Sequence, residues 1–310
     1  MSGARPPTAP MMRTGGRLGG APRFPAAAAL ALAALLSLSC MRAGARPSDP
    51  TQAAPGVDSV TVALWRFDEP AGTRCADAGP FRLDATAGPG TRSSFGRFAS
   101  AREFTRVIDS FVHTPYNPTF DAPGGLTVEA WVLAHAFGQY DDTPIASRWT
   151  QEGNEQSWLF GIVGGKARPP AARLASPGFH DRLVAGGVTG QLVFAFQPAD
   201  ASEPRAFTST QRLPLERWVH LAVSFDGSVV RFFIDGRLDA QYATRGRIQS
   251  SATPILIGNY FDPRRLTSFS GELRMQPGGD DNPYYAFEGL IDELRISNAA
   301  RSEFAGTGAR

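Results

Sequence analysis

Residues 216–240, ERWVHLAVSFDGSVVRFFIDGRLDA, contain two Asp-Gly pairs nine residues apart, and each pair follows a run of apolar residues. Asp-Gly suits a tight hairpin loop because glycine tolerates a positive φ and aspartate suits the position before it. Between Trp218 and Phe225, apolar side chains that favour burial recur at every second position, at Val219, Leu221 and Val223. This period of two indicates strands rather than a helix. The segment therefore predicts successive strands joined by tight turns.

The same pattern continues along the chain from Val60. Short apolar runs with turn residues between them follow one another, among them VTVALWRFDE, GLTVEAWVLA, SWLFGIVG, QLVFAFQ and PILIGNY. No apolar pattern of helical period and helical length accompanies them. Glycine and proline are frequent, with 33 and 25 residues, as expected for a chain with many turns. We therefore predict an all-β fold, a sandwich of two antiparallel sheets.

Two long stretches interrupt this rhythm. Residues 164–188 are rich in glycine, proline and alanine, and residues 262–287 separate two strands that a few residues could join. Loops of this length are uncommon in a compact domain and are more often functional or mobile. We interpret both as insertions into the β domain.

The N-terminal segment predicts export from the cytoplasm. RFPAAAALALAALLSLSC places an arginine before a short apolar run and then small residues, the three-part form of a secretory signal. We assign it to residues 1–40, with Met11 or Met12 as alternative starts. LSLSC resembles a bacterial lipoprotein signal, which would make Cys40 the lipidation site. In that case the protein contacts the membrane only through its lipid. Ordinary signal cleavage after AGA at 43–45 is the alternative. Residues 41–57 form a flexible tether, and the protein is either a membrane-anchored lipoprotein or secreted or periplasmic.

The charge balance argues against nucleic acid as a partner. The whole chain has 31 basic and 29 acidic residues, and residues 1–39 contain four arginines and no acid. Without that segment 27 basic residues remain against 29 acidic ones, and no basic run stands out. Of the two cysteines, Cys75 is left without a partner if Cys40 is acylated or removed, which predicts a buried thiol; a Cys40–Cys75 bridge is the alternative.

The order of several segments resembles a known family. ALWRFDEPAGTRCADAGP, LTVEAWVLA, LPLERWVHLAVSFDGSVVRFFIDGRLDA, ILIGNY and FEGLIDELRISNAARS follow one another as in laminin G-like domains of the concanavalin A-like lectin/glucanase superfamily. The resemblance implies a jelly roll of two curved antiparallel sheets over residues 58–303, followed by a tail at 304–310. It also implies that Trp65, Trp131 and Trp218 lie in the core between the sheets.

Catalytic motifs are not found in the sequence. The four histidines are far apart, and no zinc, nucleophile-elbow or phosphate-loop motif occurs. Hydrolases of this superfamily need paired carboxylates on one strand face, but Glu129 stands alone on its strand. Asp292 and Glu293 are adjacent and face opposite sides of a strand. We therefore expect no enzymatic activity, with a diverged glycoside-active enzyme as the alternative.

The resemblance further implies a calcium site where the first and last strands run side by side. The matching residues are Glu69, Asp77 and Asp292, with Asp84 as a substitute member. Carboxylates beside a loop can supply the oxygens that a hard cation needs. Solvated acids that close a loop are the alternative.

Aromatic side chains beside polar ones predict ligand contacts, since aromatic rings stack on sugar faces. Trp149 and Trp158 flank the polar stretch TQEGNEQS, and a second group lies near the 262–287 insertion: Tyr260, Asp281, Asn282, Tyr284 and Tyr285. The sequence thus predicts a non-catalytic extracytoplasmic recognition domain whose partner is a glycan or a cell-surface or extracellular protein. A structural or adhesion protein without a small-molecule ligand is the alternative of another class.

Overall fold

The computed structural model describes most of the chain beyond residue 52. The described residues are 53–107, 109–122, 124–138, 142–149, 156–165, 187–259, 266–269, 272–275, 286–305 and 307. The chain divides into two compact units, residues 1–47 and residues 48–310. All residues that the structure describes belong to the second unit. The predicted signal, the Cys40 lipidation site and most of the tether lie outside the described residues.

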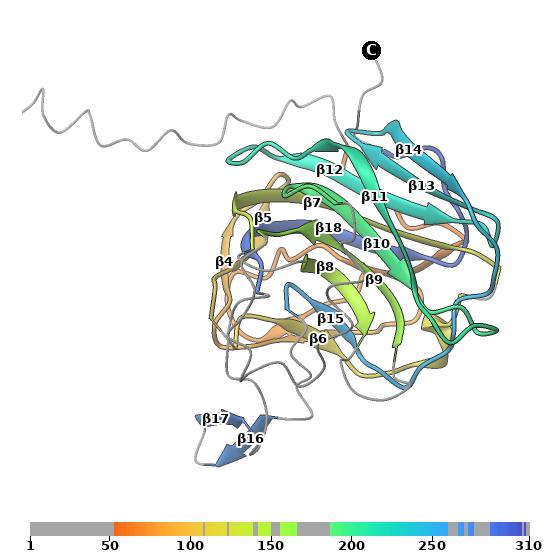
Figure 1. The fold of residues 1–310 in the computed structure, drawn as a ribbon. Coiled ribbons are helices and arrows are strands. Elements are labelled where there is room, and N and C mark those ends of the chain that lie inside the picture. The colour runs from red at the N-terminus through yellow and green to blue at the C-terminus, as the bar shows by residue number, and fades with distance from the viewer. Residues whose placement is uncertain are drawn as a thin grey trace, which may run out of the picture. The chain divides into compact units, whose positions relative to one another are not determined.

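Two antiparallel sheets form the described domain and lie face to face (Figure 1). The first sheet has the order β14-β13-β12-β7-β18-β5-β4, and β1 also pairs with β18. Its strands are β1 (Thr61–Trp65), β4 (Arg92–Phe95), β5 (Ser100–Phe104), β7 (Leu126–Ala136), β12 (Val219–Phe225), β13 (Val229–Ile234), β14 (Arg237–Ala243) and β18 (Glu288–Ser297).

The second sheet has the order β11-β10-β9-β8-β15-β6-β3-β2. Its strands are β2 (Arg74–Cys75), β3 (Ala85–Ala87), β6 (Val112–Thr114), β8 (Asp142–Trp149), β9 (Gln156–Val163), β10 (Gln191–Phe196), β11 (Arg205–Arg212) and β15 (Ile255–Ile257). A short 3-10 helix, η1 (Pro118–Phe120), precedes β7. The predicted all-β, two-sheet fold is confirmed.

The two Asp-Gly pairs occupy the predicted hairpin turns. β12 pairs with β13 and β13 with β14, both antiparallel. Asp235 and Gly236 have φ values of 49° and 74°, so both loop residues of the second hairpin are left-handed, as a type I′ turn requires. In the first hairpin the Asp226 carboxylate accepts hydrogen bonds from the backbone N–H groups of Ser228 and Val229 at 2.9 and 2.8 Å.

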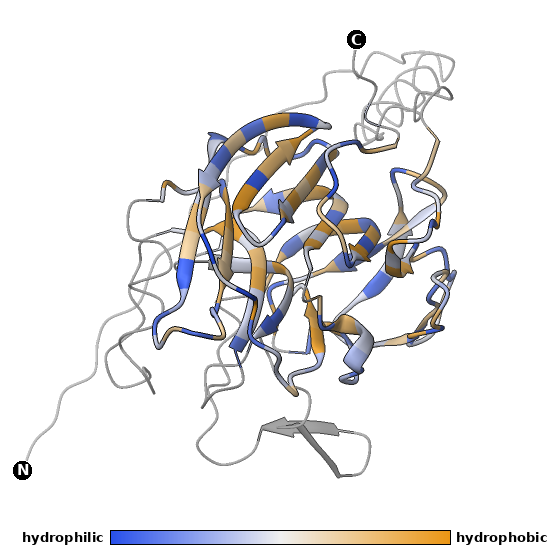
Figure 2. Ribbon diagram, turned by 90° about the vertical axis from the view of Figure 1, so that its right-hand side faces the viewer, coloured by the Kyte–Doolittle hydropathy of each residue, from blue (hydrophilic) through white to orange (hydrophobic). Residues whose placement is uncertain are grey.

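The core is built from every second residue of the facing strands, and Figure 2 shows the alternation of hydrophilic and hydrophobic residues along the strands. From β12 it takes Val219, Leu221, Val223 and Phe225, the residues that the alternation had predicted. Trp65 is fully buried in the same cluster. Each such side chain contributes about 1.5–3 kcal/mol by leaving water.

Trp131 and Trp218 do not lie in this core, so their predicted position between the sheets is wrong. Residue 131 alternates with the core residues Ala130 and Val132, and residue 218 precedes the core residue Val219, so both indoles project from the opposite face of the sheet. Trp218 packs there against a small separate apolar cluster of Ala101, Leu133 and Leu290.

Trp131 is nevertheless only 4% exposed. The ring of Phe98 meets it edge-on at 5.9 Å between centroids, and the Arg97 guanidinium lies 4.6 Å from its centroid. Cover from a neighbouring loop therefore buries this indole on a sheet face that would otherwise be open to water.

The two predicted insertions are described only in part. Of residues 164–188, those from 166 to 186 lie outside the described residues. Within 262–287, β16 (Leu266–Phe269) and β17 (Glu272–Met275) pair antiparallel as a separate two-stranded sheet. Cys75 is a buried free thiol, as predicted, and burial raises its pKa to about 11.

Candidate functional site

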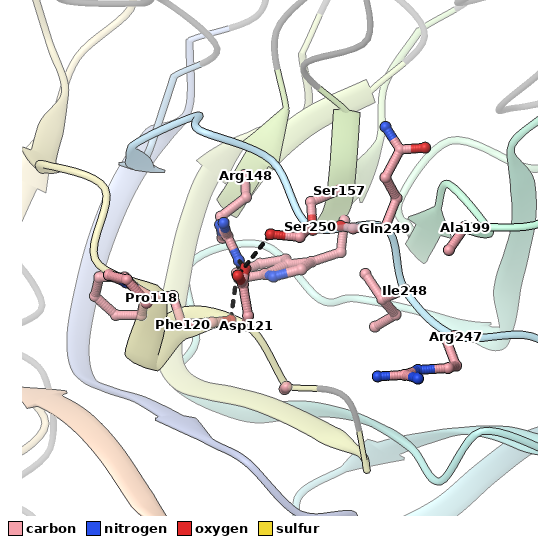
Figure 3. A pocket seen from close by; sticks show the side chains of 12 residues that line it. Pro118, Phe120, Asp121, Arg148, Ser157, Ala199, Arg247, Ile248, Gln249 and Ser250 are labelled. Carbon is pink, nitrogen blue, oxygen red and sulfur yellow. Dashed lines mark hydrogen bonds and ion pairs between the residues drawn. The ribbon is translucent and has the colours of Figure 1, made fainter.

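A pocket of ≈ 550 Å³ opens where η1 meets the adjoining ends of β8 and β9 and two loops of the second sheet (Figure 3). We call it the Arg148 pocket. Its lining residues are Pro118, Phe120, Asp121, Ala122, Arg148, Ser157, Trp158, Ala199, Arg247, Ile248, Gln249 and Ser250. The volume lies within the range of small-molecule sites, about 300–1,000 Å³.

The short helix η1 fixes one wall of the pocket. The Asn117 side chain accepts a hydrogen bond from the backbone N–H of Thr119 at 3.0 Å, which caps the helix start. Phe120 is buried in the main core and anchors the helix end. Asp121 follows directly, and its backbone N–H donates to the carbonyl of Pro118 at 3.0 Å. The carboxylate of Asp121 is thereby held at the pocket.

Arg148 is the buried cation of the pocket, and its side chain is 1% exposed. Its Nη1 donates to Oδ1 of Asp121 at 2.8 Å and to the carbonyl of Phe120 at 3.0 Å. Its Nη2 donates to the carbonyl of Ser251 at 2.5 Å, whereas its buried Nε has no hydrogen-bond partner. A buried charge needs such partners, because removing it from water is costly.

Both carboxylate oxygens of Asp121 accept hydrogen bonds within the protein. Besides Arg148 on Oδ1, the hydroxyl of Ser250 donates to Oδ2 at 2.5 Å and that of Tyr116 at 3.2 Å. Figure 3 shows Arg148 and Ser250 converging on this carboxylate from two sides. Asp121 therefore organises the pocket wall and has little capacity left to accept hydrogen bonds from a ligand.

Trp158 stands opposite Arg148 in the β8–β9 ladder. Its indole is 1% exposed, and its Nε1 has no hydrogen-bond partner. The neighbouring Ser157 hydroxyl donates to the carbonyl of Gln249 at 2.6 Å and ties β9 to the adjacent loop. Two neighbouring residues of the pocket thus each carry a buried donor that the protein leaves unused.

The loop with Arg247 and Ile248 forms the facing wall. Its backbone is held in a short antiparallel arrangement, since Ala199 N–H donates to the carbonyl of Arg247 at 2.9 Å and Ile248 forms a bridge with Pro198. The side chain of Arg247 is exposed, and within the described residues it makes no hydrogen bond or ion pair. Figure 3 shows it extending along the pocket below Ile248.

Asp77 and Asp84, two of the residues predicted to bind calcium, accept hydrogen bonds from backbone N–H groups. Oδ1 of Asp77 accepts hydrogen bonds from the N–H groups of Leu64 and Gly79 at 2.8 and 2.7 Å, and Oδ2 accepts one from Leu83 at 2.8 Å. Oδ1 of Asp84 accepts from the Asp77 N–H at 2.9 Å, while its other oxygen pairs with Arg74.

Glu69 and Asp292 complete the predicted set without joining a cluster. Oε1 of Glu69 accepts from the Ala76 N–H at 2.7 Å. Asp292 lies on β18 and accepts from the Phe98 N–H at 2.9 Å. Within the described part of the chain, no group of three or more His, Cys, Asp or Glu side chains is arranged to hold a metal ion. Calcium binding by these four residues stays a prediction.

Asp292 is a buried acid with one oxygen, Oδ1, that has no hydrogen-bond partner. Burial raises its pKa to about 8, and the charge of Glu293 acts in the same direction. Burial also raises the pKa of Glu293 to about 7, against the lowering effect of the Arg66 ion pair at 2.8 Å.

Glu129, the lone acid of its strand, is sealed inside a polar cluster on the outer face of the first sheet. His220 Nε2 lies 3.0 Å from one carboxylate oxygen, and Arg295 lies 2.6 Å from the other. Burial raises the pKa of Glu129, but the hydrogen bond and charge of His220 and the charge of Arg295 outweigh it and lower the pKa. The ring of Phe304 covers His220 at 5.2 Å between centroids. The side chains of Glu129, His220 and Arg295 are all buried.

The residues predicted to contact a ligand lie in different parts of the structure. Trp158 lines the pocket, but its indole is buried rather than displayed for stacking. Trp149 is fully buried in a separate apolar cluster with Leu159 and Val193. The remaining candidates, Tyr260, Asp281, Asn282, Tyr284 and Tyr285, lie outside the described residues.

Sequence reasoning missed Asp121, Arg148 and Arg247. One local signal was present, because Arg148 interrupts the apolar strand DTPIASRW between Ala146 and Trp149. A charged residue in a strand that is otherwise buried usually has a dedicated partner.

None of the helices in the described residues has the length and apolar character needed to cross a membrane. A search of curated proteins finds no match to this chain.

Solved structures with a similar fold include binding domains of clostridial toxins. The binding domain of Paraclostridial Mosquitocidal Protein 1 has a TM-score of 0.50 at 12% identity, covering 78% of this chain and 49% of that one. Botulinum neurotoxin type C, described as depending on two ganglioside molecules for cell entry, has a TM-score of 0.50 at 11% identity, with 78% and 48% covered.

The binding domain of botulinum neurotoxin DC, solved with rat synaptotagmin II, has a TM-score of 0.50 at 10% identity, with 78% and 49% covered. The chain thus spans about half the length of these structures. At such low identity they show a shared fold alone.

A family model described as concanavalin A-like lectin/glucanases superfamily matches residues 108–275, which is more than half of the 310-residue chain. This range includes η1, half of the strands of the first sheet, most strands of the second sheet and every residue of the Arg148 pocket. The chain belongs to the concanavalin A-like lectin/glucanases superfamily.

Proposed function

We propose that this protein is a non-catalytic recognition domain that binds a saccharide in the Arg148 pocket. The observation that carries the proposal is the pocket lining, in which the exposed guanidinium of Arg247 stands beside apolar side chains. Sites for small molecules combine apolar walls with a few polar groups in this way.

The other lining residues support the same function. Phe120, Ile248 and Ala199 supply apolar surface beside the polar groups. Saccharides present both apolar C–H faces and oxygen atoms, and sites that bind small molecules combine mostly apolar walls with a few fixed polar groups.

A binding role also agrees with the fold relatives, which include a neurotoxin described as interacting with gangliosides. Another relative was solved with the protein synaptotagmin II. A protein ligand is therefore the second class of partner. The pocket of ≈ 550 Å³ favours a small ligand, since protein–protein interfaces are usually larger and flatter.

The absence of catalysis is part of the proposal. Glycoside hydrolysis uses two carboxyl groups on either side of the scissile bond. The pocket lining has one, Asp121, and its oxygens are occupied by Arg148, Ser250 and Tyr116. An acid held in this way is poorly placed to exchange protons with a substrate.

We further propose that the domain acts outside the cytoplasm. The support is the N-terminal sequence, which has the form of a secretory signal and ends in LSLSC. Lipidation of Cys40 remains a prediction, and mass spectrometry of the mature N-terminus tests it.

Isothermal titration of the full chain with a panel of oligosaccharides tests the proposed function. Ala199 is exposed at the pocket, so Ala199→Trp should fill it and abolish binding. Ala243→Trp is the matched control, because Ala243 is exposed at the end of β14, outside the pocket. Binding that survives Ala199→Trp, or the absence of any saccharide ligand, contradicts the proposal.

A further inference from the structure

Arg247 offers unused hydrogen-bond donors at the surface of the Arg148 pocket. Its side chain is exposed and has no partner among the described residues. An arginine side chain has five N–H donors and no acceptor. A ligand must therefore present acceptors to this part of the pocket.

The only carboxylate among the described residues of the pocket lining is largely occupied. Both oxygens of Asp121 already accept hydrogen bonds, from Arg148, Ser250 and Tyr116. Asp121 therefore neither neutralises Arg247 nor offers much to the hydroxyl groups of a neutral sugar.

The net charge of the pocket lining also favours an acidic ligand. The charged side chains of the lining are Arg148, Arg247 and Asp121, which leaves one positive charge in excess. Arg148 and Asp121 form an ion pair at 2.8 Å, so the excess charge is that of Arg247. Its guanidinium lies along the pocket with no partner among the described residues (Figure 3).

We propose that the saccharide bound in the Arg148 pocket carries a carboxylate, which pairs with the exposed guanidinium of Arg247. A carboxylate accepts hydrogen bonds and donates none, and a guanidinium can bind both of its oxygens at once. This inference rests on the proposed function, because it names the ligand class of the same site.

The test compares sugars that differ by one charge. Isothermal titration of the full chain uses trigalacturonate against its methyl ester, and sialyllactose against lactose, with triglutamate as a non-saccharide carboxylate. We expect at least one acidic sugar to bind about tenfold or more tightly than its neutral counterpart, the strength of a charge-assisted hydrogen bond. The preference should shrink as sodium chloride is raised, since salt screens exposed charges.

Variants of Arg247 test whether this residue causes the preference for acidic sugars. Arg247→Gln should erase the tenfold preference for the acidic sugar, while Arg247→Lys should retain part of it, because lysine keeps the charge without the planar fork. Arg212→Gln is the control: Arg212 is also exposed and unpaired within the described residues, and it lies on β11 outside the pocket. It should leave the preference unchanged.

The outcomes separate the inference from the proposed function. Equal affinity for acidic and neutral sugars, or a preference that survives Arg247→Gln, overturns the inference, and if Ala199→Trp still abolishes binding the proposed function stands. Binding of triglutamate without any saccharide, or no binding at all, overturns both.

Discussion

Arg148 and Asp121 form an ion pair at 2.8 Å in which 1% of the arginine side chain and 28% of the aspartate side chain are exposed. The arginine also donates to the carbonyls of Phe120 and Ser251, so one guanidinium joins η1, β8 and the loop before β15. Breaking a buried pair leaves the other partner groups without their hydrogen bonds.

We therefore expect Arg148→Met to lower the free energy of unfolding by about 3 kcal/mol. Arg217→Met is the matched control, because Arg217 forms an ion pair with Asp235 at 3.0 Å in which both side chains are largely exposed. Such surface pairs contribute about 0–1 kcal/mol. Urea unfolding measures both changes, and equal losses for the two variants would contradict the structural role of Arg148.

The pocket also shows how far the sequence alone could lead. The Asp121–Arg148 contact spans 27 positions and the Arg148–Ser251 contact spans 103. Periodicity within a strand carries no information about such distant partners. The sequence could mark Arg148 as an unusual charge in an apolar strand, but only the fold brings its partners together.

The fold itself was predictable because alternation and turn chemistry are local. The Asp-Gly pairs and the residues between them gave the hairpins of β12, β13 and β14 correctly. A period of two separates the faces of a strand without saying which face is inward. Trp131 and Trp218 were assigned to the core from the family resemblance, whereas the smaller residues that alternate with them fill it.

This difference predicts unequal effects of removing two tryptophans. Trp65→Ala should cost about 3–5 kcal/mol in the free energy of unfolding, because it leaves a cavity in the main core and removes the hydrogen bond from Nε1 to the carbonyl of Leu83 at 3.0 Å. Trp218→Ala should cost about 1 kcal/mol, since this half-buried ring packs on the outer face. Urea unfolding compares them, and a larger loss for Trp218→Ala would place that ring in the core after all.

Asp292 predicts a pH dependence of stability. Its pKa is about 8 in the folded protein, against an ordinary value of 3.8. Between these values the folded state keeps a proton that the unfolded state releases, so the contribution of Asp292 is fully present below pH ~4 and is lost as the pH rises through ~8. Asp292→Asn removes this titration.

The measurement is the difference in melting temperature between the natural protein and Asp292→Asn from pH 4 to pH 9. We expect the melting temperature of the natural protein to fall relative to that of Asp292→Asn as the pH rises. Glu293, whose pKa is also raised, titrates in both proteins, so the comparison reports Asp292 together with its charge interaction with Glu293. A constant difference over this range would show that Asp292 is ionised when folded.

Alanine substitutions at Gly258 and Gly72 distinguish the cost of steric overlap from the cost of backbone strain. Both have a positive φ, 76° and 93°, which disfavours any residue with a side chain. A Cβ at 258 would overlap the ring of Phe104, whereas one at 72 would meet nothing within 4 Å. Gly72→Ala should cost about 1 kcal/mol from strain alone, and Gly258→Ala clearly more, in the same unfolding assay. Equal costs would argue that Phe104 moves aside freely.

Asp77 provides a test of how the loop after β1 is held. Its side chain is 2% exposed and accepts backbone hydrogen bonds from Leu64, Gly79 and Leu83. In Asp77→Asn one acceptor oxygen becomes a donor group, so at least one buried N–H loses its partner, which should cost about 2 kcal/mol. If the carboxylate serves only the backbone, this loss is the same in millimolar calcium and in chelator, as thermal melts of both proteins measure. A stabilisation by calcium that the natural protein shows and Asp77→Asn lacks would instead make Asp77 a metal ligand.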